Sequence, residues 1–127
     1  MIESSLIILF DKNKKILLQH RDKNAERHPN IWGFFGGKIE ENESPLEAVK
    51  RECMEELNYE LENPRLVLTK TSDERKRYCF IEEYNPKKKL TLKEGDAMQW
   101  FKMEDVKKIK TIPLVMEVCE EIASKLR

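Results

Sequence analysis

The chain is predicted to fold as an α/β (α+β) sandwich with a mixed β-sheet, in a single domain over residues 1–127. Three observations lead to this prediction. Short β-type runs lie on both sides of a strongly signalled helix near residue 50, a second helical pattern ends the chain, and no linker, repeat or low-complexity tract divides it. A domain of this length buries roughly two-thirds of its chain surface, so it needs no disulfides to be stable.

The first part of the sheet is predicted from apolar runs and turn residues. Residues 4–10 form a β-type run, 11–15 a polar turn, and 16–20 a second strand. Residues 21–30 are charged and are expected to form a loop. The aromatic and glycine-rich stretch 32–40 predicts short strands that meet at a tight turn.

The remaining elements follow the central helix. We expect a strand within 61–69, a charged loop over 71–77, strands over 78–84, 90–92 and 98–101, a short helix over 104–109 and a last helix over 113–126. The last helix is indicated by apolar residues at helical spacing. The order of sheet, helix, sheet and helix is the one expected for the sandwich.

Composition argues against several classes of function. The chain has 24 basic and 24 acidic residues, so no overall field attracts a nucleic acid polymer or an anionic membrane. The longest apolar run, residues 6–10, is too short to span a bilayer, and no basic, apolar leader is present. Cys53, Cys79 and Cys119 are odd in number and widely spaced, which suits a reducing compartment. We therefore expect a cytoplasmic protein, either a monomer or a homodimer.

The helix over residues 45–57 has the clearest start and end signals in the chain. Ser44 is suited to cap it, Pro45 fits the first helical position, and Glu47 completes a capping box. Asn58 follows the helix and tolerates the left-handed conformation that is common there.

On a helical wheel, this helix has an apolar stripe and an adjacent acidic arc. Leu46, Val49, Cys53 and Leu57 form the stripe that is expected to be buried. Glu52, Glu55 and Glu56 share an arc of about 100°. Such carboxylates repel one another and suit a hard divalent cation such as Mg²⁺ or Mn²⁺. From the helix alone, a solvated acidic face remains the alternative.

The sequence around this helix resembles the signature of the Nudix hydrolases, G-x5-E-x7-R-E-U-x-E-E-x-G-U, where U is a bulky aliphatic residue. The matching residues are Gly37, Glu43, Arg51, Glu52, Cys53, Glu55, Glu56, Asn58 and Tyr59. Every charged position and the first glycine are present. The departures are Cys53 and Tyr59 at aliphatic positions and Asn58 at the second glycine, and none removes a charged group.

The resemblance implies a Nudix-type α/β/α sandwich and a metal site on the helix. It implies that Glu52, Glu55 and Glu56 bind Mg²⁺, with Mn²⁺ as a substitute, together with the Gly37 carbonyl, and that Glu40 is an outer or additional ligand. Glu52 is either the general base or only a metal ligand. Arg51 is expected to orient a carboxylate of the signature and to pair with Glu43.

The resemblance also implies hydrolysis of a diphosphate in a nucleotide, with residues outside the helix contributing. In related enzymes a base or ligand comes from a distal loop, and the candidates are Glu94 first and Asp96 second; a polar turn is the alternative. Lys38 is positioned after the glycine turn to contact a phosphate, or is a surface lysine.

The substrate is less well defined by the sequence. The layout resembles MutT-like enzymes, which favours an (8-oxo-)dGTP or nucleoside triphosphate pyrophosphohydrolase. Phe34, Phe35, Tyr78 and Trp100 are candidates to stack on a base or are core residues, and Asp96 is also a candidate substrate contact.

Several alternatives stay open. Within the same enzyme class, the substrate is ADP-ribose, a nucleotide sugar or a dinucleoside polyphosphate. From other classes, the chain is a non-catalytic nucleotide-binding regulator, or a nucleic-acid-binding module that uses residues 87–89 and 107–108. The neutral net charge weakens the last of these.

Overall fold

The computed structural model describes residues 1–126, which form one mixed seven-stranded sheet with two α-helices and two 3-10 helices. The strands are β1 (Ile2–Phe10), β2 (Ile16–His20), β3 (Trp32–Gly33), β4 (Phe35–Lys38), β5 (Arg65–Ser72), β6 (Arg75–Glu83) and β7 (Ala97–Phe101). The helices are α1 (Pro45–Leu57), η1 (Met103–Lys108), α2 (Pro113–Ile122) and η2 (Ala123–Lys125). The predicted mixed sheet is confirmed.

Strand β1 is central to the sheet. Neighbouring strands follow the order β3-β2-β1-β6-β5, while β4 also pairs with β1 and β7 also pairs with β2. The β1–β6 pair is parallel, and the other strand pairs are antiparallel. At its N-terminal end, β1 therefore lies between β4 on one side and β6 on the other.

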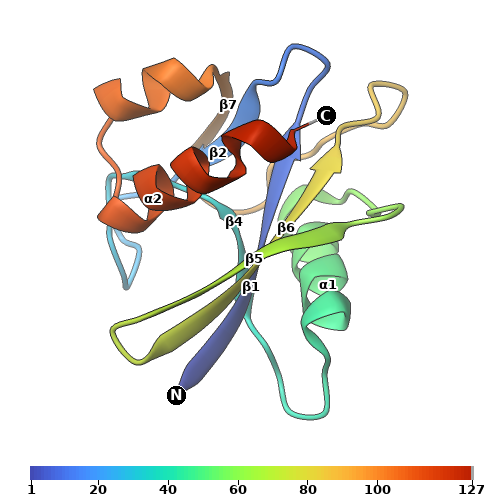
Figure 1. Cartoon of the computed structure of the whole chain (residues 1–127), viewed down its shortest axis with the longest axis vertical. Coiled ribbons are helices and arrows are strands. Elements are labelled where there is room, and N and C mark those ends of the chain that lie inside the picture. The colour runs from blue at the N-terminus through green and yellow to red at the C-terminus, as the bar shows by residue number, and fades with distance from the viewer. Residues whose placement is uncertain (127) are drawn as a thin grey trace.

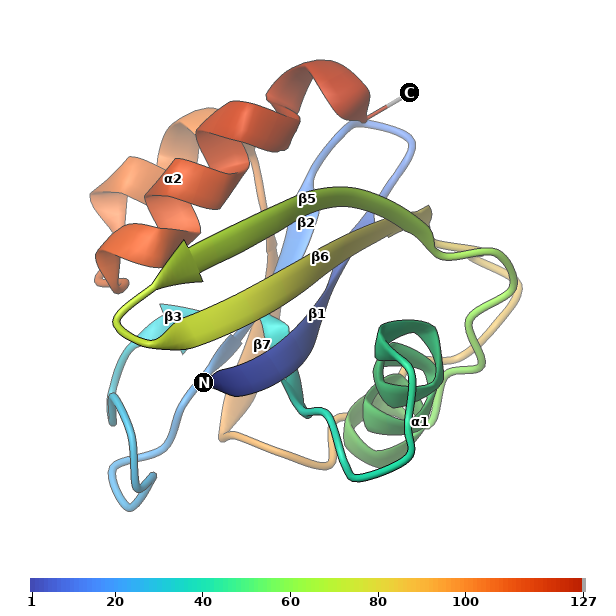
Figure 2. The same ribbon diagram turned by 60° about the horizontal axis from the view of Figure 1, so that its bottom comes forward.

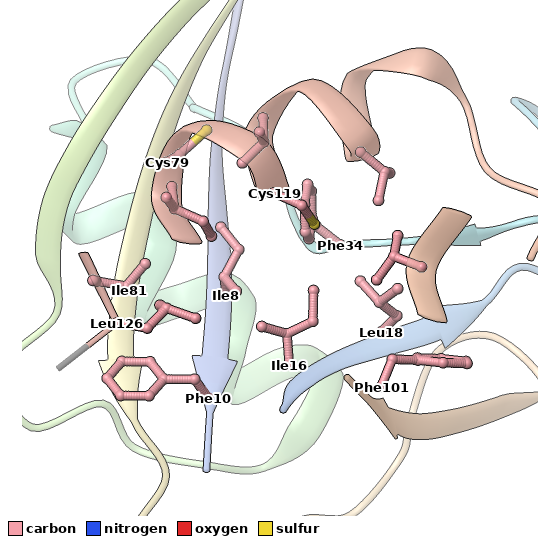
Figure 3. Close-up of a cluster of buried hydrophobic side chains, with 14 residues drawn as sticks. Ile8, Phe10, Ile16, Leu18, Phe34, Cys79, Ile81, Phe101, Cys119 and Leu126 are labelled. Carbon is pink, nitrogen blue, oxygen red and sulfur yellow. The ribbon is translucent and has the colours of Figure 1, made fainter. Parts of the chain in front are cut away.

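Helices cover both faces of this sheet, with α1 on one face and α2 on the other (Figures 1 and 2). Successive residues of β1 alternate between the two layers: Ile7 and Leu9 pack in the cluster with α1, whereas Ile8 and Phe10 pack in the cluster with α2. Figure 3 shows the second cluster. A strand buried on both faces reads as a continuous apolar run, which is what residues 6–10 are.

Helix α1 begins and ends as predicted. The Glu47 backbone N–H donates to Ser44 Oγ at 3.1 Å, and the Ser44 backbone N–H donates to a Glu47 carboxylate oxygen at 2.9 Å, which is the capping box. Asn58 ends the helix with φ 52° and ψ 38°, in the left-handed region. The stripe is only partly as predicted: Val49, Cys53 and Leu57 are fully buried, but Leu46, in the first turn, is 42% exposed. Ala48 takes its place in the buried face.

Other differences arise where a turn or a tertiary contact decides the structure. The charged segment 71–77, predicted as a loop, is a hairpin in which β5 and β6 continue to a tight turn at Asp73 and Glu74. Both turn residues have positive φ, 51° and 59°, as a two-residue hairpin turn requires, although neither is glycine. Residues 90–92 form no strand, and their segment is held by N–H groups of Thr91 and Lys93 that donate to the Leu57 and Glu56 carbonyls.

The other boundaries are close to the predictions. The strand predicted within 61–69 starts only after Pro64, the short helix is a 3-10 helix, and the last helix is α-helical to Ile122 before it tightens into η2. None of the helices in residues 1–126 combines the length and apolarity that a bilayer crossing requires.

Candidate active site

A cavity of about 500 Å³ lies at the end of the sheet where β4, β1 and β6 run side by side. Its lining comprises Ile2, Ser4, Leu6, Arg21, Glu26, Arg27, His28, Ile31, Trp32, Gly33, Phe34, Gly36, Gly37, Lys38, Glu52, Glu56, Arg75, Arg77, Glu94, Ile112, Leu114 and Val115. One part of it, which we call the acidic wall, consists of Glu52, Glu56 and Glu94. Another, which we call the arginine end, consists of Arg21, Arg27, Arg75 and Arg77.

Glu56 is the most deeply placed group of the acidic wall, with only 2% of the residue exposed. The Gly36 backbone N–H donates a hydrogen bond of 2.9 Å to its carboxylate. Burial, a hydrogen bond shared with the Glu52 carboxyl and the negative charge of Glu94 raise the pKa of Glu56 to about 10. Three carboxyl groups thus converge where negative charge is strongly disfavoured unless a cation is near.

The glycine turn makes room for the second carboxyl group. A Cβ atom at Gly37 would lie 2.6 to 2.7 Å from the Glu52 carboxylate atoms, closer than real contacts allow. Only a glycine therefore lets the β4 backbone approach the Glu52 side chain this closely.

Arg51 fixes the carboxylates around it. Its guanidinium donates two hydrogen bonds to the Glu43 carboxylate, at 2.7 and 3.0 Å, and one to Glu52 at 2.8 Å. It also contacts a Glu55 oxygen at 3.2 Å and donates to the Lys38 carbonyl at 3.1 Å. The hydrogen bonds to Glu43, followed by those to Glu52 and Glu55, hold the pKa of Arg51 well above its usual value despite partial burial. The signature side chains are therefore connected to one another through one arginine.

Glu55 and Glu40 lie on the outer side of this network. The Glu55 side chain is 57% exposed and faces Arg51, and a Glu40 oxygen is 3.5 Å from the same guanidinium. Neither residue is part of the cavity lining described above. Of the sequence-predicted ligands, the cavity brings together Gly37, Glu52 and Glu56.

The distal loop reaches the cavity through Glu94. The Lys93 backbone N–H donates to the Glu56 carbonyl at 2.8 Å, which holds this loop against the end of α1. Asp96 points elsewhere, with a carboxylate oxygen 2.8 Å from His20 Nδ1. The two candidates in this loop are thus separated: Glu94 lines the cavity and Asp96 lies outside the lining.

The aromatic candidates are divided in the same way. Lys38 lines the cavity, and so does Phe34, although Phe34 also belongs to the core cluster with α2 and is only 8% exposed. Phe35, the first residue of β4, is 1% exposed in the core beneath α1, because successive residues of an extended chain face opposite sides of the sheet. Tyr78 donates its hydroxyl to Glu3, and Trp100 packs against Tyr84; neither lies in the cavity lining.

The arginine end and the apolar side of the cavity were not predicted from the sequence. Arg21 and Arg27 come from the loop after β2, whereas Arg75 and Arg77 come from β6. No local motif marks them, because two segments about 50 positions apart meet only through the pairing of strands. The one available signal was alternation, since Arg75 and Arg77 are two residues apart and so share a face of their strand.

The acidic wall has the chemistry of a divalent cation site but is not arranged as a complete one. Within the described residues, no group of three or more His, Cys, Asp or Glu side chains is positioned to hold a metal ion. Glu52 and Glu55 direct oxygens to Arg51 instead. The donor set nevertheless fits a hard cation, since it offers only oxygens, the Glu52 carboxyl helps to raise the pKa of Glu56, and Glu56 is buried without a cationic partner.

Comparisons with known proteins agree with this geometry. A family model for the NUDIX domain matches residues 3–118. A curated 8-oxo-dGTP diphosphatase of Proteus vulgaris is 29% identical over 93 residues, which cover 71% of this chain and 82% of that protein. Two further curated relatives match over shorter segments, so that the chain spans only 17% and 43% of their lengths.

Solved structures share the fold over nearly the whole chain. A MutT structure from a study of Aliivibrio salmonicida and Vibrio cholerae has a TM-score of 0.82 at 20% identity, covering 98% of both chains. The NUDIX domain of Shewanella oneidensis NrtR, in complex with ADP ribose, has a TM-score of 0.83 at 17% identity, covering 100% of this chain and 89% of that one.

Proposed function

Because this chain belongs to the Nudix family of hydrolases, which act on pyrophosphate bonds, we propose that it is a Mg²⁺-dependent, MutT-like nucleoside triphosphate pyrophosphohydrolase. Its products would be a nucleoside monophosphate and pyrophosphate. The observation that carries the proposal is the acidic wall: Glu52, Glu56 and Glu94 face one cavity beside the glycine turn and Lys38.

We assign the cation-binding role to this wall. Glu52 and Glu56 would hold Mg²⁺ or Mn²⁺, with the Gly37 carbonyl as a further oxygen donor and Glu55 joining from the outer side of Arg51. A bound divalent ion neutralises phosphate oxygens and lowers the pKa of coordinated water. Glu40 would remain an outer group, since it is exposed and faces Arg51.

The chain's own groups then have distinct tasks. Lys38 lies at the cavity surface and would neutralise a phosphate oxygen of the substrate. Glu94 or Glu52 would take the proton from the attacking water, because both line the cavity on the same side. Arg51 acts as a positioning residue that keeps the Glu52 carboxylate next to Gly37.

Phe34 supports a nucleotide as the substrate. Phe34, which is 8% exposed, lines the cavity together with Trp32, Ile112 and Leu114, so apolar residues lie in the same cavity as the acidic wall. The similarity to the Proteus vulgaris 8-oxo-dGTP diphosphatase favours a purine triphosphate, oxidised or not.

ADP-ribose is the second candidate. The fold is shared with a NUDIX domain that was solved with ADP ribose, and the cavity has cationic groups beyond Lys38 that suit a longer diphosphate substrate. A nucleotide sugar or a dinucleoside polyphosphate belongs to the same group of alternatives. A non-catalytic nucleotide-binding regulator is the alternative from another class.

The products of hydrolysis distinguish these proposals. The protein is incubated with Mg²⁺ and a panel of (8-oxo-)dGTP, other nucleoside triphosphates, ADP-ribose and a dinucleoside polyphosphate. Pyrophosphate release supports the triphosphate assignment, whereas AMP and ribose 5-phosphate would replace it with ADP-ribose. A chelator should abolish turnover, and Mg²⁺ or Mn²⁺ should restore it.

Glu56→Gln tests the assigned site directly. The variant keeps an acceptor for the Gly36 N–H but removes the charge, so turnover should fall at least ~100-fold while the fold persists. Glu120→Gln, on the exposed face of α2, is the matched control and should keep full activity. If Glu56→Gln and Glu55→Gln both hydrolyse every substrate at the unaltered rate, the site has been misplaced; if nothing in the panel is hydrolysed, the regulator alternative gains.

A further inference from the structure

The arginine end of the cavity has an excess of positive charge that the protein itself does not neutralise. The ion pairs of residues 1–126 involve Arg51, lysines and His20, and none includes Arg21, Arg27, Arg75 or Arg77. Glu26 also lines the cavity, yet it forms no ion pair with these arginines among the described residues. The four guanidinium groups therefore face the cavity without a carboxylate partner.

Arg77 is the most unusual member, because only 9% of the residue is exposed. Its guanidinium donates to Ser72 Oγ at 3.0 Å, which is a neutral acceptor. Burial, followed by the positive charges of Arg75 and Arg27, lowers the pKa of Arg77, and the negative charge of Asp73 offsets this only in part. A buried cation without a counter-charge is unfavourable in the free protein, so an arriving anion would gain the interaction that is missing.

The loop after β2 contributes two more arginines, Arg21 and Arg27, to the arginine end. Arg21 Nε donates to the Arg27 carbonyl at 2.8 Å, and the Asn30 backbone N–H donates to the Arg21 carbonyl at 2.9 Å, so the loop is closed on itself. His28 next to Arg27 also lines the cavity, and burial together with all four arginines lowers the pKa of its ring. The four arginines are thus close enough to act on one group.

The sheet separates this end from the acidic wall. On β1, Ser4 is paired with Lys38 of β4 on one side and with Arg77 of β6 on the other. Neighbouring strands lie about 4.8 Å apart, so the backbones of Lys38 and Arg77 are about 10 Å apart. This separation leaves room for one anion beside Arg77 and another beside Gly37 and Lys38 in the same cavity.

We propose that the arginine end binds a second phosphate group of the substrate, separate from the diphosphate that is cleaved. The inference rests on the proposed function for the position of the cleaved diphosphate. Planar guanidinium groups bind phosphate oxygens in pairs, and Arg75 and Arg77 project from the same face of one strand. The second phosphate belongs either to the ribose or to the far end of a longer 5′ phosphate chain, and the two sources share this chemistry.

Binding of small nucleotides tests the proposal without relying on catalysis. Calorimetry at fixed Mg²⁺ compares adenosine 3′,5′-bisphosphate with AMP, and α,β-methylene-ATP with α,β-methylene-ADP. In at least one pair the ligand with the added phosphate should bind tenfold or more tightly; the first pair identifies a ribose phosphate and the second a phosphate at the far end of the chain. Equal affinities within both pairs would overturn the proposal.

Variants then locate the effect. In the double variant Arg75→Gln/Arg77→Gln, the ratio of affinities with and without the added phosphate should be at least tenfold smaller than in the unaltered protein. Arg65→Gln is the control, because Arg65 lies on β5 outside the cavity lining and donates to the Lys125 carbonyl. If the double variant keeps the whole gain, the arginine end is not the site. Should the double variant fail to fold, the single variant Arg75→Gln is compared with the unaltered protein in the same way, because Arg75 is only half-buried.

A hydrolysis measurement extends the test to the substrate. Coenzyme A and its 3′-dephospho form differ by one ribose phosphate, as do 2′-phospho-ADP-ribose and ADP-ribose. A ribose phosphate at the arginine end predicts a higher kcat/KM for the phosphorylated member of a cleaved pair, mainly through KM, and a ratio near one in the double variant. Absence of any hydrolysis would count against the proposed function, while the calorimetry would still decide the phosphate site.

Discussion

Arg51 and Arg77 have the same side chain in opposite surroundings. Arg51, 23% exposed in its side chain, contacts carboxylates of Glu43, Glu52 and Glu55, which raise its pKa. Arg77 is more deeply buried, contacts a serine hydroxyl, and has a pKa that burial and neighbouring arginines lower. The difference indicates that Arg51 is part of a neutralised network within the protein, whereas Arg77 forms no ion pair with any described residue. The first arrangement suits a structural task and the second suits a ligand.

The largest effect is expected in the acidic wall, the part of the cavity that Arg51 helps to position. Glu94→Gln should lower kcat about 100-fold, equivalent to about 2.7 kcal/mol, because it removes a carboxylate of the acidic wall that interacts with Glu56. Asp96→Asn is the matched control in the same loop and should change kcat less than twofold, since Asp96 pairs with His20 outside the lining. Equal losses in both variants would show that the loop, not the Glu94 carboxylate, matters.

Removing Arg51 should be the largest stability change. Arg51→Met leaves the Glu43 and Glu52 carboxylates without their shared donor, so the free energy of unfolding should fall by about 2 kcal/mol, less than for a fully buried network because the site is partly hydrated. Urea unfolding measures the change, and Lys50→Met on the exposed side of α1 is the control. A loss below about 0.5 kcal/mol would mean that the network contributes little.

The close approach at Gly37 should affect activity more than stability. In Gly37→Ala the added Cβ displaces the far end of the Glu52 side chain, so turnover should fall about tenfold, or about 1.4 kcal/mol, with little change in unfolding. Gly33→Ala is the control for the unfolding measurement, because nothing lies within 4 Å of a Cβ there. Full activity of Gly37→Ala would show that the position of Glu52 is not critical.

Arg77 should give the smallest change and the opposite sign to Arg51. Arg77→Met removes a buried cation that has no carboxylate partner, so the free energy of unfolding should stay the same or rise by up to about 1 kcal/mol. The measurement is the same urea unfolding, at the same ionic strength as for Arg51→Met. A loss as large as that of Arg51→Met would show that Arg77 stabilises the fold as Arg51 does, and the contrast between the two arginines would be wrong.

The sequence by itself determined the central helix and its chemistry. Ser44, Pro45, Glu47 and Asn58 set the limits of α1, because capping and the left-handed end depend on residues a few positions apart. The 3.6-residue period placed Glu52 and Glu56 on one side of that helix, and the glycine turn followed from its own two residues. The mixed sheet and its two helical layers could also be predicted, since each element has a local pattern.

Only the tertiary structure decided which other side chains share the cavity. Glu94 lines it and Asp96 does not, and Phe34 lines it while Phe35 is buried in the opposite core, because strand pairing and the pleat set these directions. The arginine end joins a loop and a strand about 50 positions apart through the alignment of β4, β1 and β6. Local propensity carries no information about such register, which depends on packing of the whole sheet.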